Sequence, residues 1–215
     1  MTMRCFIAGA GEYCGSYIPK PGDYVIAADA GYAALTVRGI TPDLVVGDFD
    51  SLGRLPEHPK VLQTPVEKDD TDMMTAVKQG MAHGCKVFII DGGLGGRVDH
   101  VAANLQTLAY IANRGARGYL LGREMSATAV TNGSIGFEAG SSGRVSVFCL
   151  GDKAEGVTLT GLKYPLNSAT LTCDYPLGVS NEFTGTPATV SVSEGTLIIM
   201  WESKCPVFFT GSWQL

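Results

Sequence analysis

Short apolar runs alternate with helical patterns through the first 121 residues, and this alternation constrains the fold more than any other feature of the sequence. Strands that alternate with helices of this length indicate parallel strands joined by right-handed crossovers. We therefore predict that residues 1–123 form an α/β domain with a mostly parallel, Rossmann-like sheet. The predicted strands are residues 5–8, 24–28, 44–47, 61–62, 86–90 and 119–121, and the predicted helices are residues 32–38, 72–83 and 99–113.

The pattern changes near Arg123. From there the chain offers short β-rich pieces separated by Gly, Asn, Asp and Ser, and no segment keeps a helical period. This pattern is typical of an antiparallel sandwich or a small barrel. We therefore predict an all-β C-terminal sandwich over residues 124–215. The strands predicted there are residues 127–131, 144–150, 156–162, 169–173, 189–192 and 196–201.

The composition excludes several classes of protein. Hydrophobic residues make up 45% of the 215 residues, which indicates a packed globular protein. A formal net charge of -5 leaves no basic surface for a nucleic acid, and no apolar run approaches the length of about 20 residues that spans a membrane. The N-terminal residues lack the apolar region of a signal peptide, and the cysteines lack zinc-ligand spacing. We expect free thiols and a cytoplasmic protein.

Two aspartates follow the predicted strand at residues 44–47, one residue apart. Along an extended segment, Asp48 and Asp50 would point to the same side while Phe49 turns to the core. Two carboxylates held together at the edge of a sheet repel each other unless a cation or a proton joins them.

A second acidic group, residues 67–72, comes just before a predicted helix that Thr71 or Asp72 would cap. Hard oxygen ligands suit Mg2+, which takes one or two carboxylates and leaves other positions to water and phosphate. Either group alone is equally compatible with an acidic loop or a helix start, where Asp is favoured. Together with the glycine-rich loop they indicate a magnesium-dependent site for phosphate chemistry.

That loop, residues 92–96, has four glycines in five positions between a strand and a helix. Glycine lets the backbone approach an anion, and the following helix N-terminus favours negative charge. Arg97 can pair with phosphate oxygens, although no Walker A sequence is present. Asp99 and His100 open the helix, and Asn104 lies one turn beyond His100. Instead of binding a ligand, Asp99 could cap the helix and His100 could make a structural hydrogen bond.

The acidic and glycine-rich segments share one predicted location. In parallel sheets, ligands bind beyond the carboxyl ends of the strands. Asp29, Asp48, Asp50, Asp91 and the glycine-rich loop all follow predicted strands directly. We expect them to lie along one edge of the sheet.

Five motifs resemble those of the bacterial thiamine pyrophosphokinase (thiamine diphosphokinase) family, in the same order. The resemblance covers about residues 24 to 201. This sequence departs from the family pattern at Ala30, where the family commonly has glycine. The motifs are Asp29-Ala30-Gly31, Gly47-Asp48-Phe49-Asp50-Ser51, Asp69-Asp70-Thr71-Asp72, Gly95-Gly96-Arg97-Val98-Asp99-His100 with Asn104, and Gly161-Leu162-Lys163-Tyr164-Pro165-Leu166 with Gly178-Val179-Ser180-Asn181-Glu182.

The resemblance implies an enzyme that moves the pyrophosphoryl group of ATP to the hydroxyethyl oxygen of thiamine, giving thiamine diphosphate and AMP. It implies a catalytic domain that binds ATP and Mg2+ at residues 1–123 and a thiamine-binding β-sandwich at residues 124–215. It also implies a homodimer in which the thiamine site lies between the catalytic domain of one subunit and the β-domain of the other.

The family's motif positions assign roles to particular residues. Asp48, Asp50 and Asp72 would hold Mg2+ on the triphosphate, with Asp29 near them. Ser180 and Asn181 would contact the pyrimidine ring of thiamine. Either Asp72 or Asp99 could accept the proton of the alcohol late in the transfer. The nucleotide and phosphate region would comprise Asp29, Ser51, Asp69, Thr71, Gly93, Gly96, Arg97, His100 and Asn104.

Two other functions compete. The Asp48-Phe49-Asp50 segment is similar to the nucleophile motif of haloacid-dehalogenase-type phosphatases, but here it follows the third strand, and that family has no place for the β-sandwich. A nucleotide-sensing module without catalysis would have to place phosphate beside carboxylates, which repel it unless a metal intervenes. The aromatic residue that stacks on thiamine also stays open among Tyr164, Trp201 and Trp213.

Overall fold

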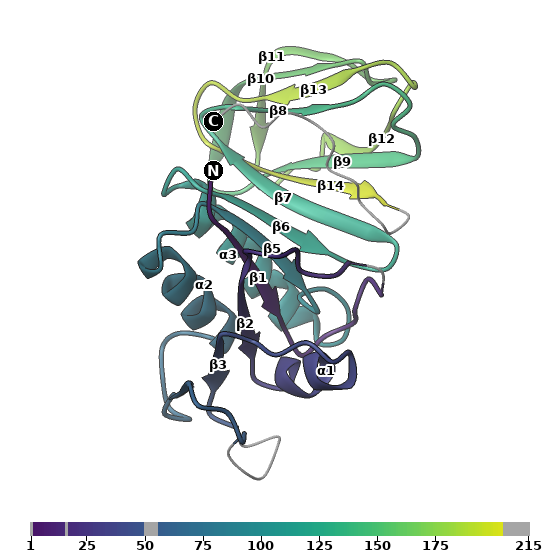
Figure 1. The fold of residues 1–215 in the computed structure, drawn as a ribbon. Coiled ribbons are helices and arrows are strands. Elements are labelled where there is room, and N and C mark those ends of the chain that lie inside the picture. The colour runs from purple at the N-terminus through teal and green to yellow at the C-terminus, as the bar shows by residue number, and fades with distance from the viewer. Residues whose placement is uncertain (1, 16, 50–55, 204–215) are drawn as a thin grey trace.

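The computed structural model describes residues 2–15, 17–49 and 56–203, and a ten-stranded sheet organises them (Figure 1). Within these residues the chain is mostly β, with three helices and a second sheet of four strands. The first six strands lie side by side in the order β6-β5-β1-β2-β3-β4, and all of them run parallel. They are β1 (Arg4–Ala8), β2 (Tyr24–Ala28), β3 (Leu44–Gly47), β4 (Val61–Gln63), β5 (Val87–Asp91) and β6 (Arg117–Leu121).

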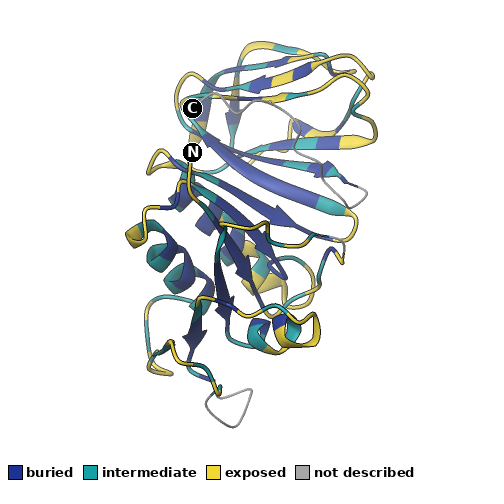
Figure 2. Cartoon of the chain, in the orientation of Figure 1, coloured by how far each residue is buried: buried dark blue, intermediate teal, exposed yellow. Residues whose placement is uncertain are grey.

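Helices cover both faces of this parallel part. Residues alternate along β1, so that Cys5 and Ile7 face α2 (Asp72–Ala82) and α3 (Val98–Ala112), while Phe6 and Ala8 face the core that includes Leu35 of α1 (Gly31–Val37). Because both faces are covered, the strands are apolar and buried almost throughout, as Figure 2 shows. The carboxyl edge of the sheet is where polar side chains can emerge.

The large sheet continues past residue 123. The strand β6 pairs antiparallel with β7 (Met125–Thr131), and antiparallel pairing then extends through β14 (Thr196–Glu202), β9 (Arg144–Cys149) and β12 (Gly178–Glu182). The division into two domains at residue 123 stays a prediction, although one sheet runs across it.

The second sheet covers one face of this antiparallel part (Figure 1). Its strands follow the order β11-β10-β13-β8, and Leu159 and Val190 share a hydrophobic core with Val147 and Ile199 of the large sheet. The strands are β8 (Ser134–Phe137), β10 (Lys153–Thr160), β11 (Leu166–Thr172) and β13 (Ala188–Ser191).

The expected alternation of strands and helices is confirmed in the first half, with ends that differ by one or two residues. Two strands of the second half, β8 and β12, were not expected. In β8 only Ile135 is fully buried, and β12 contains a register shift and a left-handed residue, Ser180. The strand β8 is only four residues long, and in β12 the register shift and the left-handed residue interrupt the alternation of apolar and polar residues.

One expectation about the cysteines is wrong. Cys14 is disulfide-bonded, whereas Cys5, Cys85, Cys149 and Cys173 are free. Spacing along the sequence does not reveal which thiols meet in space. No helix of the described part of the chain is long and apolar enough to cross a membrane.

Candidate active site

Two tight turns follow the neighbouring strands β2 and β3 and bring acidic residues together. Asp29 comes directly after β2 with a left-handed φ of 49°, which Asp tolerates better than most residues. Its N–H donates to the carbonyl of Val46 on β3 at 2.7 Å. A Cβ on Gly47 would lie 3.2 Å from Cα of Asp29, so the two turns pack closely and a larger residue would push them apart by a few tenths of an ångström.

The turn after β3 differs from the expected extended segment. The strand ends at Gly47, and Phe49 has a left-handed φ of 60°. Phe49 is buried as predicted, but the rule that places alternate residues on one side does not hold through a left-handed residue. The segment is therefore not extended at Phe49, and the inference from alternation that Asp48 and Asp50 point to one side starts from a wrong premise. Asp50 and Ser51 themselves lie outside the described residues.

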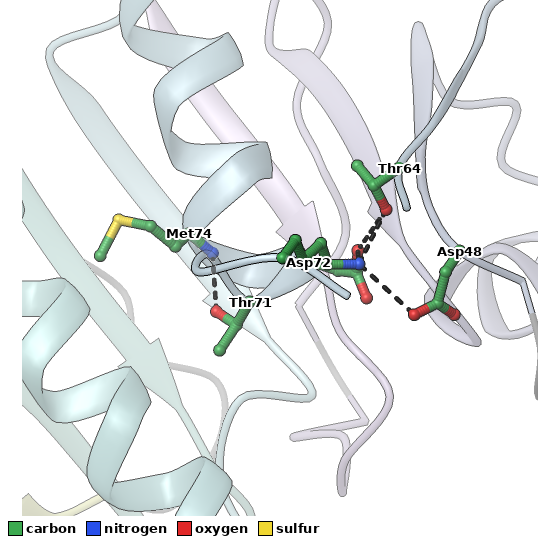
Figure 3. Close-up of polar contacts among 6 residues, drawn as sticks. Asp48, Thr64, Thr71, Asp72 and Met74 are labelled. Atoms are coloured by element: carbon green, nitrogen blue, oxygen red, sulfur yellow. Dashed lines mark hydrogen bonds and ion pairs between the residues drawn. The ribbon is translucent and has the colours of Figure 1, made fainter. Parts of the chain in front are cut away.

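Helix α2 presents Asp72 at its first residue. The hydroxyl of Thr71 accepts a hydrogen bond from N–H of Met74 at 3.1 Å, so of the two predicted caps, Thr71 and Asp72, it is Thr71 that caps the helix (Figure 3). The carboxylate of Asp72 therefore starts the helix, where negative charge is favoured. Asp69 is exposed on the loop before it.

The ammonium of Lys68 joins Asp72 to Asp48. Its Nζ donates to Oδ1 of Asp72 at 2.7 Å and lies 3.4 Å from Oδ2 of Asp48. Thr64, just beyond β4, accepts from the same ammonium at 2.8 Å and donates its own hydroxyl to Oδ1 of Asp72 at 3.1 Å. Figure 3 shows Asp48, Thr64 and Asp72 pointing toward one another. The described part of the cluster thus draws on three separate segments of the chain.

Burial and charge act in opposite directions on Lys68. Burial lowers the pKa of its ammonium, but the hydrogen bond and charge of Asp72, with the charge of Asp48, outweigh burial and raise the pKa above its ordinary value. The side chains of Lys68, Asp48 and Asp72 are only 15%, 15% and 20% exposed. Lys68 therefore stays charged. The only sequence signal for Lys68 is its position four residues before Asp72, within the acidic group.

The carboxylates of Asp48 and Asp72 suit a divalent cation. They come from different elements, converge on one positive centre and offer only hard oxygen ligands. Among the described residues no group of three or more His, Cys, Asp or Glu forms a metal cluster. The expected third ligand, Asp50, is not among those residues.

The glycine-rich loop is held by its backbone. The N–H of Gly11 donates to the carbonyl of Gly92 at 2.7 Å, and N–H of Glu12 donates to the carbonyl of Leu94 at 3.0 Å. A Cβ on Gly9 would lie 2.6 Å from the carbonyl oxygen of Gly92. The loop after β1 therefore lies directly on the loop after β5, backbone against backbone.

Asp91, the last residue of β5, fixes the same two loops from inside the protein. It is fully buried, and its Oδ1 accepts from N–H of Cys14 at 2.8 Å and from N–H of Gly92 at 3.0 Å. The guanidinium of Arg38 lies 3.7 Å from Oδ2 and also stacks over the ring of Tyr13. Burial raises the pKa of Asp91, although these partners oppose the rise. The sequence placed Asp91 at a strand end but gave it no role.

The residues beyond the loop divide into a buried and an exposed group. Asn104 is buried, and its Nδ2 donates to the carbonyl of Gly93 at 2.7 Å, so it supports the loop from α3. Arg97 and Asp99 form an ion pair at 2.6 Å with side chains that are 72% and 65% exposed. The hydrogen bond from Arg97 lowers the pKa of Asp99, which makes it a weaker base. His100 is exposed and does not share the buried side of α3 with Asn104.

A cavity of about 310 Å³ lies beside the glycine-rich loop. Glu12, Leu94 and Gly95 line one side, and the turn between β6 and β7, residues 122–125, lines the other. The cavity therefore borders the carboxyl edge of β5 and β6.

The predicted thiamine residues lie at the other end of the sheet. Ser180 and Asn181 are on β12, which is one edge strand of the large sheet, whereas β3 and β4 are at the opposite edge (Figure 1). Ser180 is exposed, while Asn181 is buried and exchanges two hydrogen bonds with the backbone of Tyr164. Of the aromatic candidates, Tyr164 is exposed, Trp201 packs on Phe137 in the core, and Trp213 is outside the described residues.

Comparisons with known proteins agree over most of the chain. A family model described as thiamin pyrophosphokinase, catalytic domain, matches residues 18–120, and one described as thiamin pyrophosphokinase, vitamin B1 binding domain, matches residues 138–197. Thiamine pyrophosphokinase of Bacillus subtilis (strain 168) is 29% identical over 182 residues, which are 81% of this chain and 85% of that protein.

Solved structures show the same similarity. The crystal structure of thiamine pyrophosphokinase from Bacillus subtilis has a TM-score of 0.81 and 26% identity, and the match covers 93% of this chain and 99% of that one. That of thiamin pyrophosphokinase from Geobacillus thermodenitrificans has a TM-score of 0.78 and 26% identity, over 95% and 99% of the two chains.

Proposed function

The chain belongs to the thiamin pyrophosphokinase family, and from this premise we propose how its residues carry out the transfer of a pyrophosphoryl group from ATP to thiamine. The products are thiamine diphosphate and AMP. The attacked atom is the β-phosphorus, so the protein must hold the hydroxyethyl oxygen of thiamine opposite the departing AMP. Transfers of this kind depend mostly on positioning and on neutralising charge.

The proposal depends most on Asp48 and Asp72, which converge on one cation at the carboxyl edge of β3. With Asp50 they would hold Mg2+, which when bound would neutralise the phosphate oxygens of ATP. Asp29 lies on the adjoining turn and would belong to the same acidic face. Asp69, Thr71 and Ser51 keep their assignment to this region as predictions.

The glycine-rich loop would receive the phosphates and the nucleoside. Its backbone can approach an anion closely, the N-terminus of α3 favours negative charge, and Arg97 is exposed and free to turn toward phosphate when it leaves Asp99. The nucleoside would enter the cavity next to Leu94 and Gly95, whose volume is at the lower end of the range for small-molecule sites. Gly93 and Gly96 would line this region, with Asn104 holding the loop and His100 near its outer end.

The positions of Ser180 and Asn181 support a homodimer. Eight strand spacings separate β12 from β3, which is on the order of 30–40 Å in a twisted sheet and too far for one thiamine to bridge. A second copy could bring its β12 to the acidic cluster of the first. In the same proposal, residues 1–123 are the Rossmann-like catalytic domain and residues 124–215 the thiamine-binding sandwich of a cytoplasmic enzyme.

Of the two candidate bases, Asp72 lies in the carboxylate cluster where the phosphates would bind, whereas Asp99 lies at the exposed start of α3. Asp72 is therefore our candidate for the group that would accept the proton of the alcohol. The alternative of a phosphatase that is phosphorylated on Asp48 has no support from the comparisons, which match thiamine pyrophosphokinases over both halves of the chain.

The reaction is tested by incubating the protein with ATP, Mg2+ and thiamine and separating the products by chromatography. We expect AMP and thiamine diphosphate in equal amounts, and neither without thiamine. Release of ADP or of inorganic phosphate instead would contradict the proposal. Omitting Mg2+ in the presence of a chelator should abolish both products.

The shared site is tested with two variants that each lose activity. Asp48→Asn removes a carboxylate of the cluster, and Ser180→Trp blocks the proposed thiamine position on an exposed residue. If each site combines one residue from either subunit, mixing equal amounts after dissociation should restore about a quarter of the normal activity, because half of the dimers then carry one intact site. No recovery, in a mixture shown to contain mixed dimers, would place both residues in one subunit.

A further inference from the structure

The ammonium of Lys68 lies between the two carboxylates that would bind a divalent ion. We propose that Lys68 is a positioning residue: it holds Asp48 and Asp72 together as a resident cation and competes with the divalent ion for their oxygens. This inference rests on the metal role given to these carboxylates in the proposed function. It assigns a role to a residue that none of the sequence motifs singled out.

The geometry accounts for every hydrogen of the ammonium. An ammonium has three N–H donors, and three acceptors surround this one, namely Asp72 at 2.7 Å, Thr64 at 2.8 Å and Asp48 at 3.4 Å. In the same order, these acceptors begin α2, follow β4 and follow β3. Lys68 is therefore fixed at the point where three segments meet, and it links them.

The charges explain why such a link is needed. Two carboxylates that approach the same point repel each other, and their limited exposure weakens screening by water. A cation between them removes the repulsion before any metal or nucleotide is present. The cluster would therefore be preformed, at the cost that a divalent ion must displace the ammonium to reach the same oxygens.

A second lysine, Lys78, lies on α2 and provides a matched control. Lys78 also forms an ion pair with an aspartate of the acidic group, Asp70, but it contacts a single carboxylate. Its side chain and that of Asp70 are 42% and 38% exposed, so water screens the pair. Removing Lys78 deletes the same charge from the same protein without opening the proposed cation site.

The experiment measures Mg2+ binding and thermal unfolding without nucleotide, in the wild type and in Lys68→Met, Lys68→Arg and Lys78→Met. We expect Lys68→Met to bind Mg2+ on the order of tenfold more tightly, because a competing charge has gone, and to unfold a few degrees lower when no divalent ion is present. Saturating Mg2+ should remove most of that thermal difference. Lys68→Arg and Lys78→Met should bind Mg2+ with close to wild-type affinity.

Unchanged or weaker Mg2+ binding by Lys68→Met, with a circular dichroism spectrum like that of the wild type, would overturn the competition. If Lys68→Met does not fold, Lys68→Ser and Lys68→Gln are measured in its place with the same expectation. An Asp48→Asn variant separates the two proposals. If it loses Mg2+ affinity, the metal role stands whatever Lys68→Met does; if it does not, both proposals fail.

Discussion

The acidic turn after β3 and the glycine-rich loop after β5 lie at the same edge of one sheet, but different interactions hold them. Side-chain charges on Asp48, Lys68 and Asp72 hold the first. Backbone hydrogen bonds and the buried carboxylate of Asp91 hold the second. The first should therefore be sensitive to changes of charge and to metal, and the second to an added methyl group and to the loss of a buried acceptor. Four substitutions can break or sharpen this comparison.

The largest effect is expected at the acidic turn. Asp48→Asn should lower kcat about 1,000-fold because charge neutralisation at the phosphates is lost, while the urea midpoint of unfolding changes little. The measurement is AMP formation at saturating substrates, beside urea unfolding. Asp70→Asn, whose carboxylate pairs with Lys78 outside the cluster, serves as the control. A kcat of Asp48→Asn within tenfold of the wild type would count against the charge-based account.

A large loss of stability is expected at the glycine-rich loop. In Gly92→Ala the new Cβ would lie 2.7 Å from the carbonyl oxygen of Gly9, at a left-handed φ of 75°. We expect a loss of about 3 kcal/mol in the free energy of unfolding, from the clash and the backbone conformation together. Gly96→Ala has a similar φ of 70° but no atom within 4 Å, so it should lose only about 1 kcal/mol. Equal losses in urea unfolding would show that the contact between the two loops contributes nothing.

A smaller effect is expected where the loop gives way to α3. Asp99 pairs with Arg97 in an exposed position that water screens, so Asp99→Asn should leave the urea midpoint of unfolding close to that of the wild type. If Asp72 accepts the proton, kcat should fall by less than about tenfold in this variant. A loss of kcat as large as that of Asp48→Asn would instead make Asp99 the base.

The smallest effect concerns Asp91 and pH. Burial raises the pKa of Asp91 in the folded protein, so its contribution to stability is full below the unfolded pKa, near 3.9, and is lost as pH rises through the folded pKa. The difference in unfolding free energy between the wild type and Asp91→Asn should therefore shift against the wild type as pH rises from about 3.5, and then level off. Urea unfolding between about pH 3 and pH 7 measures it. A shift in the opposite direction would show that Arg38 outweighs burial.

The sequence predicted the segments of this edge better than their contacts. Strand ends, the cap at Thr71 and the placement of acids and glycines beyond the strands depend on local patterns, and the structure agrees with them. The turn at Phe49 was missed because a left-handed residue leaves no mark in a pattern of apolar residues. Lys68 was missed because its second carboxylate, Asp48, is 20 residues away along the chain, and the lysine of an acidic loop is commonly only a surface charge.

The roles of individual side chains were hardest to predict. Asn104 was grouped with the nucleotide residues, yet its amide is bound to the loop backbone. Asn181 was assigned to thiamine, yet its amide is bound to the backbone of Tyr164. In both positions the sequence shows only an asparagine, which can either support a loop or bind a ligand. The two roles can be told apart only from which part of the chain lies beside the amide. Whether either also touches a substrate stays a prediction.

The hairpin between β6 and β7 has a consequence for how this protein can be divided. Because β7 completes the hydrogen bonds of β6 and packs on α3, the first 123 residues expressed alone would expose the backbone of β6 and an uncovered apolar side of α3. Such a fragment would be prone to aggregate. The catalytic and vitamin-binding regions therefore cannot be exchanged between relatives as independent modules, and a working chimera would have to carry the β6–β7 pair intact from one parent.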